Sequence, residues 1–457
     1  MKLRLPCGAG CTAGQLTRYM ESVENRGNIM KRERPFVAKL VSDQELPRMF
    51  RVKQVFPRPR IEPEEIPEII ENLLSEERFA GKVKPGMRIA ITAGSRGIAN
   101  VALTTKCIAD FVRSRGAHPF IVPAMGSHGG ATAEGQRKIL EGYGITEEYC
   151  GCPIISSMEV KKIGVNEEGM EVFIDKNAAE ADGIILGCRI KPHTAFRGPY
   201  ESGIMKMMAI GLGKQHGAEV CHEAGFKNMA KYVPMFGRAI IENAPILFAV
   251  PTIENAFDET CKIVAVNAEE IVEKEPPLLQ EAFANMPRIL VDECDVLVVD
   301  QIGKNFSGDG MDPNITGTFC TPYATGGIKA QRVCVLDLSP ETHGNGIGLG
   351  YASATTKRVF EQLDFASMYP NAITCTVLGG VRIPIIMESD KEAIQVCVRT
   401  CNEIDKTQAR IVRIPNSLHI EHIMLSEAYY EEAKENPNLI IESEPEYLPF
   451  DDNGNLW

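Results

Sequence analysis

The chain has 457 residues, of which 44% are hydrophobic and 24% charged, and it carries a formal net charge of −12. This length is too great for one compact core and predicts two or three domains, and the composition excludes a disordered or fibrous protein. An acidic chain lacks the broad basic surface that binds a phosphate backbone, so we expect no nucleic-acid partner.

The 14 cysteines are scattered along the chain, and several lie in apolar runs such as 333–335, where cysteine behaves as a small hydrophobic residue. This distribution indicates a reducing compartment rather than a disulfide framework. No apolar run reaches the roughly 18 residues of a membrane span, and the N-terminus lacks an apolar segment of secretory length. We therefore expect a soluble, cytoplasmic protein with no membrane partner.

Residues 1–35 are rich in Gly, Arg and Glu without a sustained period and predict a loosely ordered extension. From Lys84 onward, short β-branched runs alternate with longer helical patterns, which is typical of βαβ units. The predicted elements are strands at 88–92, 119–123, 183–187 and 246–250 and a helix at 99–115. They indicate an N-terminal α/β domain over 36–288, built on a largely parallel, doubly wound sheet.

A second series of strands is predicted at 295–300, 332–336, 372–377 and 409–413, with a helix over 390–403 between the last two. These elements predict a C-terminal α/β domain over 289–424. A helix at 278–286, preceded by the Glu-Pro-Pro segment 275–277, leads across the boundary. Residues 425–457 are predicted to form a C-terminal helix and an acidic tail that packs back on one of the two domains.

Ligands of open α/β sheets bind at the carboxyl ends of the strands, so the loops that follow the predicted strands are the first places to search for a site. Four of these loops contain reactive side chains, and we expect them to meet on one rim. They carry Ser95 and Arg96, then His128, then Lys191 and His193, and finally Gln301 and Lys304.

Three of the eight histidines, His193, His216 and His222, fall within residues 191–222. Imidazole titrates near neutral pH and also binds transition metals, so this cluster could transfer protons or hold a metal. His216 and His222 are six residues apart and lie on different faces of a helix, and neither Cys-x-x-Cys nor His-Glu-x-x-His occurs. A standard zinc site is not predicted. His419 and His422 are expected on the surface of a late helix.

The loops taken together resemble the nickel-dependent lactate racemase family, whose members carry a nickel-pincer nucleotide. The resemblance covers roughly residues 50–425. It rests on the Gly-Ser-His128-Gly loop, Lys-Pro-His193, Ser202-Gly203-x-x-Lys206, a histidine sixteen residues after that lysine, and Gln301-x-x-Lys304. The resemblance implies two α/β domains with the cofactor in a cleft between them.

The resemblance also implies roles for these residues. His128 and His193 would be the catalytic acid/base pair, Lys206 would attach the cofactor covalently through a thioamide, and His222 would bind the nickel. The remaining implied site residues are Arg96, Gln301 and Lys304 for the substrate and Ser95, Ser202 and Gly203 for the cofactor. The implied partners are a small 2-hydroxy acid and the enzymes that make the cofactor.

The implied activity is a racemase or epimerase that inverts C2 of a 2-hydroxy carboxylic acid by hydride transfer to the cofactor, assisted by the two histidines. Two departures from the family concern the substrate pocket. Ala93 stands where well-known members have an acidic residue, and the segment from His193 to Lys206 is about three residues longer than in those members. A substrate larger or more polar than lactate is therefore at least as plausible as lactate itself.

Two other functions remain open. The chain could be a zinc- or iron-dependent hydrolase or lyase, with His128, His193 and His222 as joint metal ligands. It could also be a non-catalytic protein that binds a small acid at the same loops.

Overall fold

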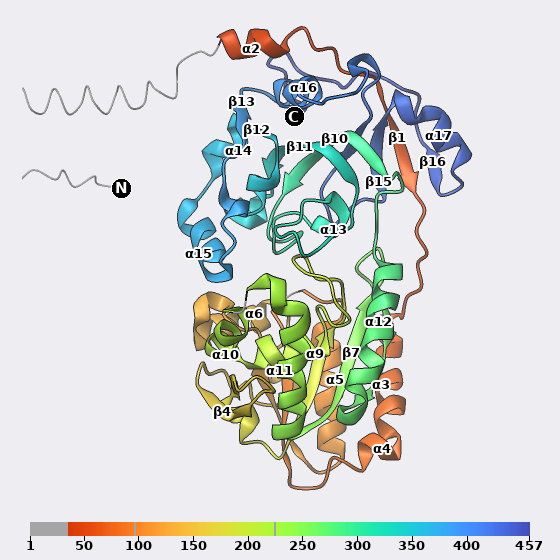
Figure 1. Cartoon of the computed structure of the whole chain (residues 1–457). Coiled ribbons are helices and arrows are strands. Elements are labelled where there is room, and N and C mark those ends of the chain that lie inside the picture. Colours follow the sequence, from red (N-terminus) through yellow and green to blue (C-terminus); the bar gives the residue numbers. More distant parts are fainter. Residues whose placement is uncertain (1–34, 96, 224) are drawn as a thin grey trace, which may run out of the picture. The chain divides into compact units, whose positions relative to one another are not determined.

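The structure is a computed structural model that describes residues 35–95, 97–223 and 225–457 (Figure 1). Two compact units divide the chain, Met1–Glu45 and Leu46–Trp457. Helix α2 (Pro35–Val41) belongs to the first unit. The extension predicted at 1–35 lies outside the described residues except for its last residue.

The second unit contains a six-stranded sheet with the order β3-β2-β6-β7-β8, and β9 also pairs with β7. Strands β3, β2, β6 and β7 run parallel, and β8 and β9 pair antiparallel with β7. The bounds are β2 (Arg88–Ala93), β3 (His118–Pro123), β6 (Gly183–Arg189), β7 (Ile246–Glu254), β8 (Thr260–Ile263) and β9 (Val266–Asn267). The prediction of a largely parallel sheet is confirmed.

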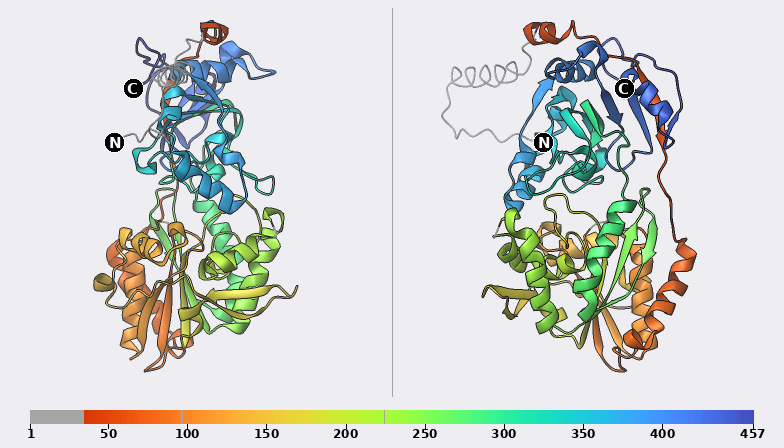
Figure 2. Two further views of the ribbon diagram at one scale, coloured as in Figure 1. Left: turned by 90° about the vertical axis from the view of Figure 1, so that its left-hand side faces the viewer. Right: turned by 45° about the vertical axis from the view of Figure 1, so that its right-hand side comes forward.

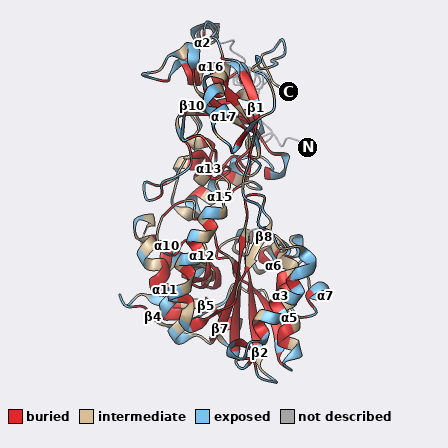
Figure 3. Cartoon of the chain, turned by 90° about the vertical axis from the view of Figure 1, so that its right-hand side faces the viewer, coloured by how far each residue is buried: buried red, intermediate tan, exposed pale blue. Residues whose placement is uncertain are grey.

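The parallel strands are buried on both faces, which explains their continuous apolar runs. Ile89 and Ile91 point into one hydrophobic core, and Ala90 between them points into the other. Helices α3 (Ile66–Ser75) and α5 (Val101–Ser114) cover the first face, and α11 (Met229–Asn243) and α12 (Ile271–Asn285) cover the second. They are seen in orange and in green on opposite sides of the strands in Figure 2. Figure 3 shows the strands of this sheet as buried almost throughout.

The helices of this region and one antiparallel hairpin complete the N-terminal half of the second unit. The helices are α3 (Ile66–Ser75), α4 (Glu77–Ala80), α5 (Val101–Ser114), α6 (Ala133–Gly142), α7 (Glu147–Cys150), α8 (Lys176–Ala179), α9 (Ile204–Lys206), α10 (Lys214–His222), α11 (Met229–Asn243) and α12 (Ile271–Asn285). The hairpin pairs β4 (Val160–Val165) with β5 (Glu171–Asp175).

Helix α12 begins earlier than predicted and includes the Glu-Pro-Pro segment, which was expected to precede it. Proline at position 276 has no N–H for the carbonyl four residues earlier, and such a loss normally breaks a helix. Here the hydroxyl of Tyr200 donates to that carbonyl, the one of Val272, over 2.6 Å. A tertiary contact thus replaces the missing bond.

The second sheet has eight strands in the order β13-β12-β11-β10-β14-β15-β1-β16. The first five are parallel, and β15, β1 and β16 join in antiparallel pairs. The strands are β1 (Met49–Gln54), β10 (Glu293–Ile302), β11 (Lys329–Leu338), β12 (Ala354–Thr356), β13 (Ile385–Met387), β14 (Ile411–Ile414), β15 (His422–Ser426) and β16 (Leu439–Ile441). Its helices are α13 (Pro313–Thr316), α14 (Lys357–Gln362), α15 (Phe365–Cys375), α16 (Asp390–Arg399) and α17 (Tyr430–Glu435).

Strands β1 and β16 pair in the eight-stranded sheet, although they lie far from one another in the sequence. Residues 49–54 were assigned to the N-terminal domain and 439–441 to the tail, yet both add strands to the eight-stranded sheet. A strand's hydrogen-bonding partner can come from any distance along the chain, and local sequence does not reveal it. The division of the chain into domains stays a prediction.

Two local predictions in this region are wrong. Residues 372–377 were expected to form a strand, but α15 covers most of them, because Met368 and Ala372 bury one helical face and Asp364 caps the start of the helix by accepting from Ala366 N–H. The late helix expected to carry His422 is instead strand β15, in which buried and less buried residues alternate.

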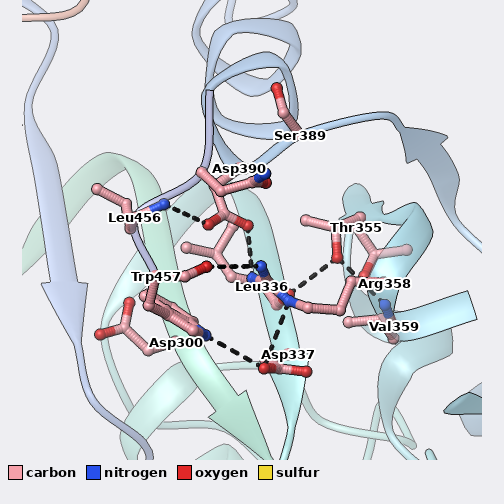
Figure 4. A network of polar contacts seen from close by, with 12 residues as sticks. Asp300, Leu336, Asp337, Thr355, Arg358, Val359, Ser389, Asp390, Leu456 and Trp457 are labelled. Carbon is pink, nitrogen blue, oxygen red and sulfur yellow. Dashed lines mark hydrogen bonds and ion pairs between the residues drawn. The ribbon is translucent and has the colours of Figure 1, made fainter. Parts of the chain in front are cut away.

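The last residues of the chain contact the eight-stranded sheet and its helices (Figure 4). Leu456 N–H donates to Asp390 Oδ2 over 2.8 Å, and Trp457 Nε1 donates to Asp337 Oδ2 over 3.3 Å. The Arg358 guanidinium donates to Asp390 Oδ1 over 2.7 Å and lies over the Trp457 ring. The acidic tail therefore packs on this sheet. None of the helices in the described ranges is long and apolar enough to cross a membrane.

Candidate functional site

Three of the four predicted loops leave the same edge of the six-stranded sheet. They follow β3, β2 and β6, which are adjacent and parallel, so their carboxyl ends lie side by side. Gln301 lies near the end of β10 of the eight-stranded sheet, and Lys304 lies in the loop that follows this strand. Three of the predicted loops therefore share one rim. The fourth does not leave this edge, because it belongs to a different sheet.

The loop after β2 carries Ser95, whose backbone carbonyl accepts from the Tyr143 hydroxyl over 2.9 Å. Arg96, the predicted carboxylate-binding residue, lies outside the described residues. Buried Ala93 ends β2 immediately before this loop.

His193 lies in the loop after β6 and is held on several sides. Its backbone N–H donates to Glu201 Oε2 over 2.6 Å, and its Nδ1 accepts from the N–H of Ala195 over 3.0 Å. Its Nε2 lies 2.7 Å from Lys206 Nζ. Burial, followed by the nearby charges of Lys206 and Lys191, holds the pKa of His193 well below its usual value. The ring is therefore neutral near pH 7 and able to accept a proton.

Lys206 is the last residue of α9, directly before a π-helix, η3 (Met207–Leu212). The N-terminus of α9 rests on Glu275 of α12, whose Oε2 accepts from Met205 N–H over 3.0 Å. A Cβ at position 203 would clash with Glu275 Oε1, which explains why Gly203 is a glycine. Burial raises the pKa of Glu275 to about 8, against the lowering effect of the N–H groups of Met205 and Ile204.

Ser202 closes the loop that carries His193. Its carbonyl accepts from Lys191 N–H over 2.8 Å, and its N–H donates to Lys191 O over 3.2 Å. The two chain segments are thereby paired just before His193 and just before Lys206. This pairing is consistent with the close approach of those two side chains.

The two histidines of α10 have different environments. His222 is half-buried at the end of the helix, and burial together with the charge of Lys206 lowers its pKa to about 4. Its charge also influences the pKa of His193, so His193, Lys206 and His222 are electrostatic neighbours. His216 is exposed, and its ring packs 4.5 Å from that of Phe173. The geometry therefore places His222 with the cluster and His216 on another face of the helix.

His128 lies in the loop after β3, and glycines shape this loop. Gly129 and Gly130 have φ values of 67° and 65°, which side chains rarely adopt. A Cβ on Gly129 would also lie 2.6 Å from the backbone nitrogen of Gln136, so this loop packs directly on α6. The carbonyl of His128 accepts from Gln136 Nε2 over 3.3 Å.

Gln301 and Lys304 contact other parts of the eight-stranded region. Gln301 N–H donates to Pro415 O over 3.0 Å, and Lys304 Nζ donates to Asn371 Oδ1 of α15 over 2.7 Å. The structure gives each a defined position in the eight-stranded region. Their place near the substrate stays a prediction.

Arg197 connects the His193 loop to residues that follow β10. Its guanidinium donates to His193 O over 2.6 Å, to Thr325 O over 3.1 Å and to Asn314 Oδ1. It also pairs with buried Glu201 at 3.2 Å. Sequence reasoning missed Arg197, Glu201 and Glu275, since none belongs to a recognisable motif and their importance depends on contacts made on folding.

In the described ranges, no group of three or more His, Cys, Asp or Glu side chains is arranged to hold a metal ion. A zinc or iron site formed jointly by His128, His193 and His222 therefore finds no support in this geometry. His222 and Lys206 fit a cofactor that carries most of the metal's ligands itself, and needs one neutral imidazole from the protein, better than they fit a bare metal ion. His222 offers that imidazole, with the Lys206 amine as its electrostatic neighbour.

Comparison with known proteins supports the resemblance found in the sequence. Residues 36–232 match the family described as the lactate racemase N-terminal domain. This range contains all the predicted site residues except Gln301 and Lys304. A search of curated proteins gave no match to the chain.

Two solved structures share the fold. The lactate racemase apoprotein from Thermoanaerobacterium thermosaccharolyticum matches 80% of this chain and 94% of its own, with 14% sequence identity and a TM-score of 0.51. A protein from Thermotoga maritima matches 80% of this chain and 99% of its own, with 13% identity and a TM-score of 0.50. At this identity the likeness concerns the fold, and it spans both sheets.

Proposed function

We propose that this protein is a racemase or epimerase that inverts C2 of a 2-hydroxy carboxylic acid with a nickel-pincer nucleotide attached to Lys206. The observation that carries the proposal is the contact between Lys206 Nζ and His193 Nε2, with His222 as an electrostatic neighbour. This cluster lies in the part of the chain that matches the lactate racemase N-terminal domain.

When bound, the cofactor would accept the C2 hydrogen as hydride and return it, which avoids removal of a weakly acidic proton. Lys206 would attach it, and His222 would be the protein ligand of the nickel. The low pKa of His222 suits this role because only the neutral imidazole binds a metal. Ser95, Ser202 and Gly203 would line the same place.

His128 and His193 would each exchange the hydroxyl proton of one enantiomer. His193 is suited to accept it, since burial and neighbouring charges keep its ring neutral. Arg96 would grip the carboxylate with its forked guanidinium, so that the carbon stays in place while the carbonyl turns. Lys304 would stabilise negative charge on the substrate oxygen, with Gln301 beside it.

The substrate would be a 2-hydroxy acid, and one larger or more polar than lactate is at least as plausible as lactate itself, because Ala93 stands where well-known members of the family have an acidic residue. The proposal places the protein in the cytoplasm. The enzymes that make the cofactor would be its partners.

The test is intact-mass and peptide mass spectrometry of protein purified from a host that makes the cofactor. We expect an added mass on the Lys206 peptide, bound nickel, and inversion of at least one 2-hydroxy acid. Lys206→Ala should lose all three, and Lys138→Ala should keep them, because Lys138 is exposed on α6 and pairs only with Glu134 there.

An adduct on another lysine would contradict the proposal. Lys214 is a poor alternative, since its side chain is fully buried and paired with Asp175. Zinc or iron in place of nickel, without an adduct, would favour the hydrolase or lyase.

A further inference from the structure

Helix α10, which ends at His222, begins at a lysine with no exposed surface. Lys214 Nζ lies 3.1 Å from Asp175 Oδ2, and both side chains are 0% exposed. The ammonium also donates to Pro123 O, at the end of β3, and to Gln136 Oε1 of α6 over 3.2 Å. One buried charge therefore joins the end of β3, the end of β5, α6 and α10.

This arrangement is energetically costly. Lys214 has a φ of 54°, a left-handed conformation that costs an ordinary residue about 1–2 kcal/mol. Burial also lowers the pKa of its ammonium, and Asp175 offsets this effect only in part. A buried and strained lysine persists only where its surroundings hold it in place, and here those surroundings lead to two predicted site residues.

The first connection leads to His128. Gln136 is fully buried, and its Nε2 donates to Gly126 O over 2.8 Å and to His128 O over 3.3 Å. An ammonium can only donate hydrogen bonds, so Lys214 requires the amide oxygen of Gln136 to point toward it. The amide nitrogen is then directed at the carbonyls of the His128 loop. Lys214 thus determines the orientation of the group that holds this loop.

The second connection runs along α10 itself. Lys214 is the first residue of the helix and His222 is the last. A rigid helix of this length transmits a shift or rotation at one end to the other. The position of the ammonium therefore bears on His222 as well as on His128.

We propose that Lys214 and Gln136 are positioning residues that set the His128 loop and the His222 helix relative to each other. The catalytic consequence rests on the proposed function, in which His128 serves one enantiomer. The positioning itself does not rest on the proposed function, because it is a property of the protein without cofactor. The two parts can be tested separately.

The first experiment uses the cofactor-free protein and hydrogen exchange of the segment 124–132. Gln136→Met keeps the volume of the side chain and removes both donations to the loop, so exchange there should rise about tenfold, the effect of losing about 1.4 kcal/mol. Lys138→Met, two residues along the same helix, is the matched control and should leave it unchanged. Unchanged exchange in folded Gln136→Met would overturn the positioning.

The second experiment uses the cofactor-loaded protein and a single turnover with each pure enantiomer. Gln136→Met should slow by about ten- to a hundredfold the same enantiomer that His128→Ala slows most, and should change the other less than about threefold. Equal slowing of both enantiomers would indicate a general structural role and refute the proposal. If the parent oxidises no 2-hydroxy acid, the proposed function fails, while the exchange experiment still decides the positioning.

The lysine is tested with its counter-ion, since Lys214→Met alone would leave Asp175 buried and uncompensated. In Lys214→Met/Asp175→Asn, exchange of 124–132 should rise as in Gln136→Met, and nickel bound per folded chain should fall. If both readouts match the parent, Lys214 has no positioning role.

Discussion

The amine nitrogen of Lys206 lies 2.7 Å from Nε2 of His193. Nδ1 of the same ring accepts from the N–H of Ala195, so both ring nitrogens have a partner. The Lys206 side chain thus lies in direct contact with the imidazole, and its charge contributes to the low pKa of His193. The contact fixes the amine beside the imidazole, so that a change at His193 should alter the surroundings of Lys206.

The reactivity of Lys206 should therefore depend on His193. In the cofactor-free protein at pH 7, we expect the rate at which trace acetic anhydride labels Lys206 to differ about tenfold between His193→Leu and the parent, as expected for the loss of an interaction of about 1.4 kcal/mol. Peptide mass spectrometry gives the ratio of labelling at Lys206 to labelling at Lys138. This ratio corrects for differences in the amount of reagent between samples. An unchanged ratio would show that the imidazole does not control the amine.

His128 and His193 should act on opposite faces of one carbon. Replacing either with alanine should abolish net inversion, because each enantiomer needs its own base. With the help of the remaining histidine, one enantiomer can still be oxidised and reduced again without inversion. The measurement follows inversion and cofactor reduction with each enantiomer in both variants. Inversion near the parental rate in either variant would refute the two-histidine mechanism.

Nickel should depend on His222 and not on His216. The two histidines share α10, so His216→Ala is a matched control, and it removes an exposed ring that packs on Phe173. We expect His222→Ala to lose most of its nickel and His216→Ala to keep it, measured by elemental analysis at equal folded fraction. Unchanged nickel in His222→Ala would assign the ligand elsewhere.

Glu275 should make the protein less stable as the pH rises. Its pKa is about 8 in the folded protein, above the ordinary value of 4.5 for a glutamate. Between these values the folded state keeps a proton that the unfolded state has lost, so its contribution is complete at low pH and decreases through this window. Glu275→Gln keeps a carbonyl oxygen for Met205 N–H and cannot ionise.

The free energy of unfolding of Glu275→Gln, relative to the parent, should consequently rise by about 2–3 kcal/mol between pH 6 and pH 9. Urea denaturation at intervals over this range measures the difference. Glu134→Gln is the control, because Glu134 is exposed and its pKa is lowered by Lys138. A difference that does not change with pH would show that Glu275 is ionised throughout.

Local patterns were sufficient for the parallel strands and for the loops that follow them. Runs such as 89–91 and 184–186 are apolar on both faces, which is a property of the residues themselves and identifies a buried strand. The order Gly-Ser-His128, Lys-Pro-His193 and Lys206 could likewise be read directly, and it led to the lactate racemase resemblance that residues 36–232 confirm.

Local patterns failed where a distant partner determines the conformation. Residues 372–377 are rich in β-branched side chains, yet the buried face of α15 outweighs this preference. Pro276 of α12 is tolerated because Tyr200 supplies a hydrogen bond from another part of the chain. Strand β1 joins the eight-stranded sheet through pairing with β15, more than 300 residues away.

The sequence by itself determined which residues could carry the chemistry, because side-chain type and spacing are written in it. Only the tertiary structure decided their surroundings: the Lys206 amine against His193, the cluster with His222 and without His216, and buried Glu275 beneath Gly203. These relationships arise from burial and from contacts between segments distant in the chain. Burial and proximity set the protonation state of a group, and both exist only after folding.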